Sequence, residues 1–171
     1  YHRSLLESGE YWRQSMTRFD AQSRVDATLM SNLRIMRRTL INQISKRCDK
    51  SKETITSVVH SLLCRSIFIK YLEERKDSNG ETVFPQGFYS NFLESAERYT
   101  DVLNSKSATY SLFNTLKEKF NGDTLQVSEV EIEIITQNDL DELRTFILGD
   151  SELESKQLAL WPFYSFDIIP I

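Results

Sequence analysis

The sequence predicts a mainly α-helical protein: a helical bundle built on a long antiparallel helical hairpin, with a short extended C-terminal tail. Apolar residues recur at spacings of three and four over long stretches, as amphipathic helices require. Glycine and proline are scarce, at 5 and 3 of 171 residues, and the stretch 51–76 is the most apolar run of helical length. Few turn-forming residues favour long helices over a β architecture with many turns.

The stretch Ser51–Lys76 is the predicted central helix. Ser51 is a preferred N-cap residue, and the run ends in the charge cluster Glu73–Lys76. Its polar residues do not form a clean stripe opposite the apolar ones, so we expect burial on more than one side. The apolar residues are Ile55, Val58, Val59, Leu62, Leu63, Ile67, Ile69 and Tyr71.

A second amphipathic helix is predicted over Arg24–Lys50, directly before the central one. Only the short break 49–51 separates the two, so an antiparallel hairpin is the simplest arrangement. The apolar positions step by four or three residues: Val25, Leu29, Leu33, Met36, Leu40, Ile44 and Cys48. The residues expected to face outward include Arg34, Arg37, Arg38, Lys46 and Arg47.

After the central helix, the turn signal Asp77–Gly80 predicts a loop over 76–87. A third helix is expected over residues 89–103. A fourth is expected over 109–120, with Asn121 and Gly122 as its C-terminal stop.

Residues 123–136 alternate apolar and acidic side chains, which suits one short edge strand or, because of the four acids, an exposed connection. A short helix is predicted from Asn138 to Leu148, stopped by Gly149. Residues 150–157 are a polar linker, and Pro162 and Pro170 predict an extended tail up to residue 171.

The predicted organisation is a partly helical N-terminal segment over 1–23, a helical domain over 24–149, and a linker and extended tail over 150–171. The chain begins at Tyr1 rather than a methionine and ends on an apolar run. We therefore expect a piece cut from a longer protein.

The net charge of −4 conceals a gradient along the chain. Residues 1–50 hold ten Lys/Arg against five Asp/Glu, whereas residues 101–171 hold five against thirteen. The basic first part either marks a nucleic-acid contact or is an ordinary solvated surface. No apolar run reaches the roughly 18 to 20 residues of a membrane span, and no signal peptide opens the chain. Cys48 and Cys64, expected to be reduced core residues, favour a cytoplasmic protein without membrane partners.

Residues for catalysis do not gather in any familiar pattern. Glycine-rich phosphate loops are missing from the sequence, neither cysteine has a near partner for zinc, and His60 lies in the middle of a predicted helix with a structural role expected. We therefore assign no catalytic, cofactor-binding or metal-binding residue. The functional candidates are Arg34, Arg37, Arg38, Lys46 and Arg47, as contacts to DNA phosphates. The alternatives are a solvated helix face, or arginines paired with the acidic C-terminal third.

Four segments, taken in order, carry a resemblance to a known family. They read RVD at 24–26 followed by Leu29 and Asn32-Leu33, LLCRSIFIKYLEER at 62–75, FNGD at 120–123, and QLALWPFYSFDIIP at 157–170. The chain resembles the helical region just upstream of the catalytic domain in N6-adenine DNA methyltransferases of fused (type IIG-like) restriction–modification and related phage-defence systems.

This resemblance implies a parent enzyme that methylates adenine with S-adenosylmethionine, with or without a linked endonuclease. The glycine-rich cofactor loop and the Asn-Pro-Pro-aromatic motif of such enzymes are not in these 171 residues, so it implies no activity for this piece. The implied partners are its own downstream methyltransferase domain and double-stranded DNA, which must be held while a base is flipped. The alternative function is a helical protein–protein interaction module, docking through its ends near Trp12 and Trp161.

Overall fold

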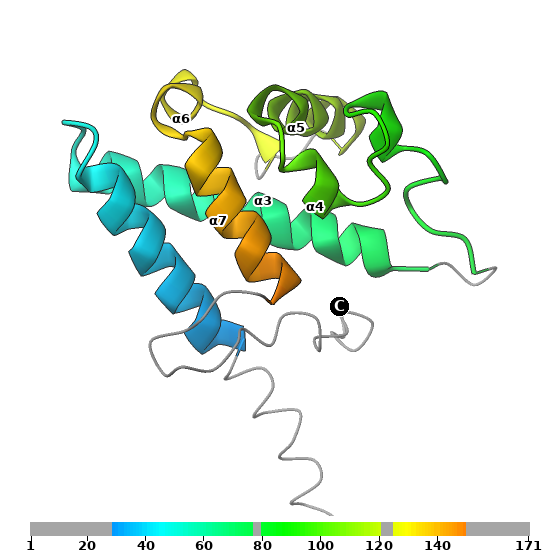
Figure 1. Cartoon of the computed structure of the whole chain (residues 1–171), viewed down its shortest axis with the longest axis horizontal. Coiled ribbons are helices and arrows are strands. Elements are labelled where there is room, and N and C mark those ends of the chain that lie inside the picture. Colours follow the sequence, from blue (N-terminus) through cyan, green and yellow to red (C-terminus); the bar gives the residue numbers. More distant parts are fainter. Residues whose placement is uncertain (1–28, 77–79, 121–124, 150–171) are drawn as a thin grey trace, which may run out of the picture.

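The computed structural model describes residues 29–76, 80–120 and 125–149. These residues fold into a group of helices around one apolar core, which confirms the predicted fold class (Figure 1). Within them no strand forms, and an isolated antiparallel bridge joins Lys76 and Thr82. The predicted segments 1–23 and 150–171 lie outside the described residues, as do the start of the first helix and the stop at Asn121-Gly122.

The central helix is α3, Lys52–Glu74, within one or two residues of the predicted bounds. It begins as expected, because the Ser51 hydroxyl accepts the backbone N–H of Thr54 at 3.2 Å. The predicted burial on more than one side is not confirmed, because Ser57, His60 and Cys64 form an exposed stripe opposite the buried residues. Buried side chains lie along its whole length: Ile55, Val58, Val59, Leu62, Leu63, Arg65, Ser66, Ile69 and Leu72.

By length and mean hydropathy alone, 1.3 over an 18-residue window, α3 qualifies as a helix that could cross a membrane. The expectation that no stretch reaches this threshold was therefore wrong. Half of that window is buried inside the fold, and Arg65 and Ser66 lie in its middle. A core helix of a helical domain passes the same test, because it too is apolar on most sides.

The preceding helix occupies residues 29–45 of the described chain, and Lys46 and Arg47 form the turn after it. Met36, Leu40 and Ile44 point into the core, as the spacing predicts. Figure 1 shows this helix and α3 forming a V, so the antiparallel hairpin is not confirmed. The short helix α4 (Tyr99–Val102) contacts α3.

The predicted helix over 89–103 is wrong as a single element. The structure has a 3-10 turn, η1 (Tyr89–Asn91), and a separate short helix, α4 (Tyr99–Val102). Two features break it: Ser95 adopts a positive φ of 64°, and the Asp101 carboxylate accepts the N–H groups of Glu97 and Arg98, both at 3.0 Å. The Asp101 carboxylate thus starts a new helix where the apolar spacing had indicated continuity.

The next helix, α5 (Lys106–Phe120), begins three residues before its predicted start and buries Leu112, Phe113 and Leu116. Residues 129–134 were predicted as an edge strand or exposed connection, and they instead form the helix α6 (Glu129–Ile134). The Ser128 hydroxyl caps it by accepting the Glu131 N–H at 3.1 Å. A capped turn with acids near its positive end is stable enough to override the alternating pattern.

The last described helix, α7 (Gln137–Leu148), agrees with the prediction within one residue. Asp139 accepts hydrogen bonds from the backbone N–H and the hydroxyl of Thr136, both at 2.8 Å, which holds the first turn. Gly149 ends the helix in the left-handed region, at a φ of 83°, where other residues are strained. Figure 1 shows α7 crossing α3.

Candidate functional site

The predicted basic surface begins with three arginines on the helix over residues 29–45. Arg34 and Arg38, one turn apart, are exposed on the side away from the core. Arg37 lies nearer the core and is half-buried. Its Nε is buried with no hydrogen-bond partner among the described residues. Two of the three arginines are therefore exposed to solvent.

The other two predicted contacts, Lys46 and Arg47, lie in the turn after this helix and have different surroundings. Lys46 is exposed. The Arg47 Nη2 donates to the Asp139 Oδ2 at 2.6 Å, and the Asp139 side chain is fully buried. Arg47 thus links the end of the first helix to the first turn of α7, although its own side chain is 36% exposed.

A second ion pair likewise joins a base from the first part of the chain to an acid from the last part. The Lys50 Nζ lies 3.0 Å from the Glu133 carboxylate at the end of α6. Basic residues from the first part of the chain therefore meet acids from its last part, which is the pairing that the sequence left open as an alternative. The five predicted residues do not form one uniform surface: Arg34, Arg38 and Lys46 are exposed, Arg37 is partly covered and Arg47 is paired.

The strongest charge cluster is one that the sequence analysis did not find. Arg65, fully buried in α3, donates to both carboxylate oxygens of Glu131, at 2.7 and 2.8 Å. It also donates to the Gln126 carbonyl at 3.1 Å. Its guanidinium carbon lies 4.8 Å from the centre of the Phe113 ring, a cation–π distance. Arg65 therefore ties α3 to α5 and α6.

Two tyrosines border this cluster. The Tyr110 hydroxyl lies 3.4 Å from the Glu131 Oε1, and the Tyr99 hydroxyl lies 2.8 Å from the Ser66 Oγ. Burial raises the pKa of both tyrosines well above its ordinary value, so both hydroxyls keep their protons at neutral pH. The cluster is closed to solvent and binds the helices together.

A signal for this cluster was present in the sequence. Arg65 stands within the most apolar helical run, and a buried guanidinium requires a carboxylate and further acceptors. What the sequence did not reveal is which acid supplies them, because Glu131 was predicted to lie on an edge strand or an exposed connection.

The histidine and cysteine side chains of the described residues do not gather into a site. His60 is exposed on α3, Cys64 is exposed, contrary to its predicted place in the core, and Cys48 packs partly against the core. In the described ranges, no three His, Cys, Asp or Glu side chains converge in a way that could hold a metal ion.

No protein-family model matches this chain, and no curated protein or solved structure matches it either. The case for a function therefore depends on the residues themselves.

Proposed function

We propose that the chain is a non-catalytic helical domain of an adenine-N6 DNA methyltransferase of the restriction–modification or phage-defence type. In this proposal it supports the downstream catalytic domain and lies beside the DNA backbone, in the cytoplasm. The parent enzyme uses S-adenosylmethionine, which this piece does not itself bind.

The observation that carries the proposal is the place of residues 62–75 in the fold. This segment carries the largest part of the resemblance within the described residues, and it is the core-facing body of α3. Three of its charged members are buried or partly buried and paired: Arg65 binds Glu131, and the Lys70 Nζ lies 2.5 Å from the Glu73 carboxylate. Residues used in this way fit a supporting role better than a reaction.

The DNA contact is proposed for the exposed cations Arg34, Arg38 and Lys46. Arg47 is a poorer candidate than its sequence position indicated, since binding a phosphate would leave Asp139 buried without its cation.

The test has two parts. The longer protein encoded by the same gene should methylate adenine in duplex DNA, whereas the 171-residue chain should neither methylate DNA nor bind S-adenosylmethionine in calorimetry. A gene without the cofactor loop and the Asn-Pro-Pro-aromatic motif would reject the family assignment. Failure of the chain to bind duplex DNA even at low salt would instead favour the protein–protein interaction module.

A further inference from the structure

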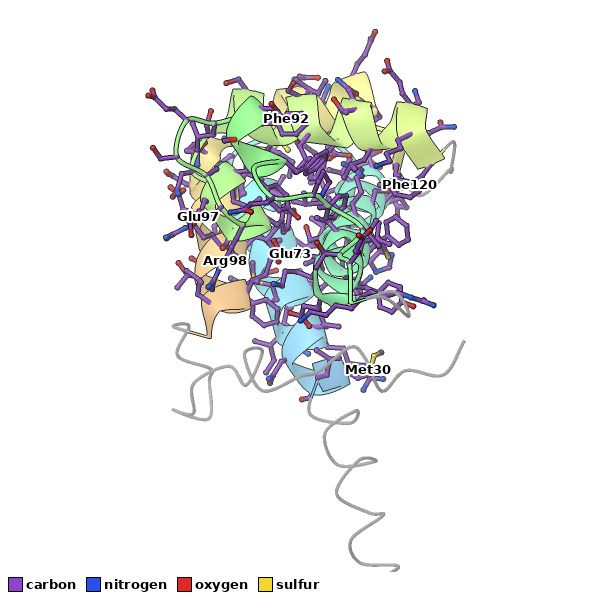
Figure 2. All side chains as sticks on the ribbon, turned by 90° about the vertical axis from the view of Figure 1, so that its right-hand side faces the viewer. Met30, Glu73, Phe92, Glu97, Arg98 and Phe120 are labelled. Atoms are coloured by element: carbon purple, nitrogen blue, oxygen red, sulfur yellow. The ribbon has the colours of Figure 1, made fainter. Side chains whose placement is uncertain are left out.

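The solvent-facing side of α3 carries a straight row of residues, here named the α3 seam. Its members follow one another at steps of four or three residues, so they share one face of the helix. In Figure 2, α3 lies on the side of the described fold away from α7. Five members are exposed and two aromatic ones are half-buried: Glu53, Ser57, His60, Cys64 and Arg75, then Phe68 and Tyr71.

The α3 seam carries charge only at its two ends. Between Glu53 and Lys70 the one charged residue of α3 is Arg65, which is buried and paired with Glu131. The exposed positions in between are neutral, although 27% of the chain is charged. A solvated helix face is usually charged, whereas loss of charge at the centre of an exposed face is typical of a protein–protein interface.

The two halves of the seam differ in size. After Cys64 come two aromatic rings. Phe68 packs edge-to-face against Phe120 of α5, which Figure 2 labels, with ring centres 6.0 Å apart. The Arg75 guanidinium carbon lies 5.5 Å from the centre of the Tyr71 ring. Before Cys64 the seam offers a small side chain, Ser57, so each half fits the other better than it fits itself.

The seam is complementary to itself when two copies of α3 meet in antiparallel orientation. Its midpoint is Cys64, because Glu53 and Arg75 are equally far from it along the helix. If a two-fold axis passes between the two helices at Cys64, residues equally distant from Cys64 stand opposite each other. Glu53 then meets Arg75 of the second copy at both ends, and Ser57 leaves space for Tyr71. A parallel pair would instead bring like charges together.

We infer that the chain forms an antiparallel homodimer through the α3 seam, with Cys64 facing Cys64 of the second copy and Glu53 paired with Arg75. The charges favour a second copy over a different partner, because both members of each ion pair belong to the same face. The contact is confined to one helix face, so the dimer is of the small, transient class and half-formed at roughly 100 µM.

Sedimentation equilibrium of the 171-residue chain measures this association, and the melting temperature of each variant checks that it is folded. Glu53→Arg and Arg75→Glu should each weaken the dimer about tenfold, because opposite charges become like charges at both ends. The double variant Glu53→Arg/Arg75→Glu should associate as the parent does, since the ion pairs form again with exchanged signs. Glu94→Arg, at an exposed acid outside the seam, is the matched control and should not change the association.

A chain that stays monomeric at about 1 mM, ten times the expected midpoint, would overturn the inference. A folded double variant that associates no better than the two single ones would also overturn it.

Disulfide formation locates the two-fold axis. Helices packed about 8–10 Å apart bring facing Cα atoms within the range of a disulfide. Added diamide should take two protons and two electrons from the two Cys64 thiols and leave one S–S bond between the copies, seen as a dimer on a non-reducing gel. Cys48→Ser should crosslink as the parent does, and Cys64→Ser should not. Crosslinking through Cys48, or a monomer whose Cys64 is shielded from thiol reagents by another segment of the chain, would contradict the inference.

Discussion

The Arg65 guanidinium and the Glu131 carboxylate, 66 residues apart in the chain, form two hydrogen bonds in the interior, with 0% and 1% of their side chains exposed. A buried pair of this kind contributes little net stability relative to apolar residues of the same size, because both groups lose their hydration. The pair nevertheless selects one arrangement of the helices, since burying either charge without its partner would destabilise the folded state. The pair therefore determines where α6 must dock on α3.

Arg65→Met should lower the free energy of unfolding by about 3–5 kcal/mol, because Glu131 would remain buried without its cation. The double variant Arg65→Met/Glu131→Leu should recover most of this loss. Urea unfolding followed by circular dichroism measures both, with Lys117→Met on the exposed side of α5 as the control. A double variant no more stable than the single one would show that the pair's charges are not what couples α3 to α6.

Arg47→Gln should destabilise the protein by about 1 kcal/mol, because the fully buried Asp139 loses a charged donor while keeping its bonds to Thr136. The expected loss of stability is small because Arg47 itself is 36% exposed and partly screened by water. Thermal unfolding is the measurement. Lys46→Gln, the exposed neighbour in the same turn, should leave the melting temperature unchanged, and an equal effect of both variants would argue against the Arg47 ion pair.

The DNA proposal predicts a specific salt dependence. If Arg34 and Arg38 each neutralise one phosphate, Arg34→Gln/Arg38→Gln should reduce the slope of log affinity against log salt by about 2. The melting temperature should not change, since both side chains are exposed. Fluorescence anisotropy with a labelled duplex over a salt series gives the slopes. Lys117→Gln/Lys119→Gln on α5 is the control, and an equal change in both double variants would mean non-specific attraction.

Stability should fall steeply at alkaline pH. Burial raises the pKa of Tyr89, Tyr99 and Tyr110 above the ordinary value of about 10, so the folded protein keeps three protons that the unfolded chain releases. The stabilisation is complete below pH 10 and is lost as the pH rises further, by about 1.4 kcal/mol per pH unit for each tyrosine.

Urea unfolding between pH 8 and pH 12 checks this dependence, and absorbance of the tyrosinate ion monitors the titration itself. In concentrated urea all seven tyrosines of the chain should ionise near pH 10. A folded protein in which all of them ionise there would show that Tyr89, Tyr99 and Tyr110 are open to solvent.

Local signals were sufficient for several elements. Ser51 starts α3 through its own hydroxyl, and Gly149 stops α7 through its own left-handed backbone, so both helix boundaries could be predicted locally. The spacing of Met36, Leu40 and Ile44 likewise predicted which face of the first helix is buried.

Some errors were local, as at Asp101, which bonds Glu97 and Arg98 only four and three residues away, and others arose where a distant partner decides the outcome. Asp101 starts a new helix that the apolar spacing alone did not indicate, and Glu131 is buried because Arg65 of α3 needs a carboxylate. Of the predicted basic residues, Arg47 is distinguished from Lys46 by Asp139, which comes 92 residues later in the chain. Spacing along a helix shows which residues share a face, but it does not show which charge they meet.

The sequence by itself determined that the described part of the chain is helical, where α3 and α7 begin and end within two residues, and which face of the first helix is buried, because periodicity and capping act over a few residues. The tertiary structure alone decided which charges are used internally and how α6 docks. Burial and ion pairing depend on groups brought together from distant parts of the chain, so no local pattern could specify them.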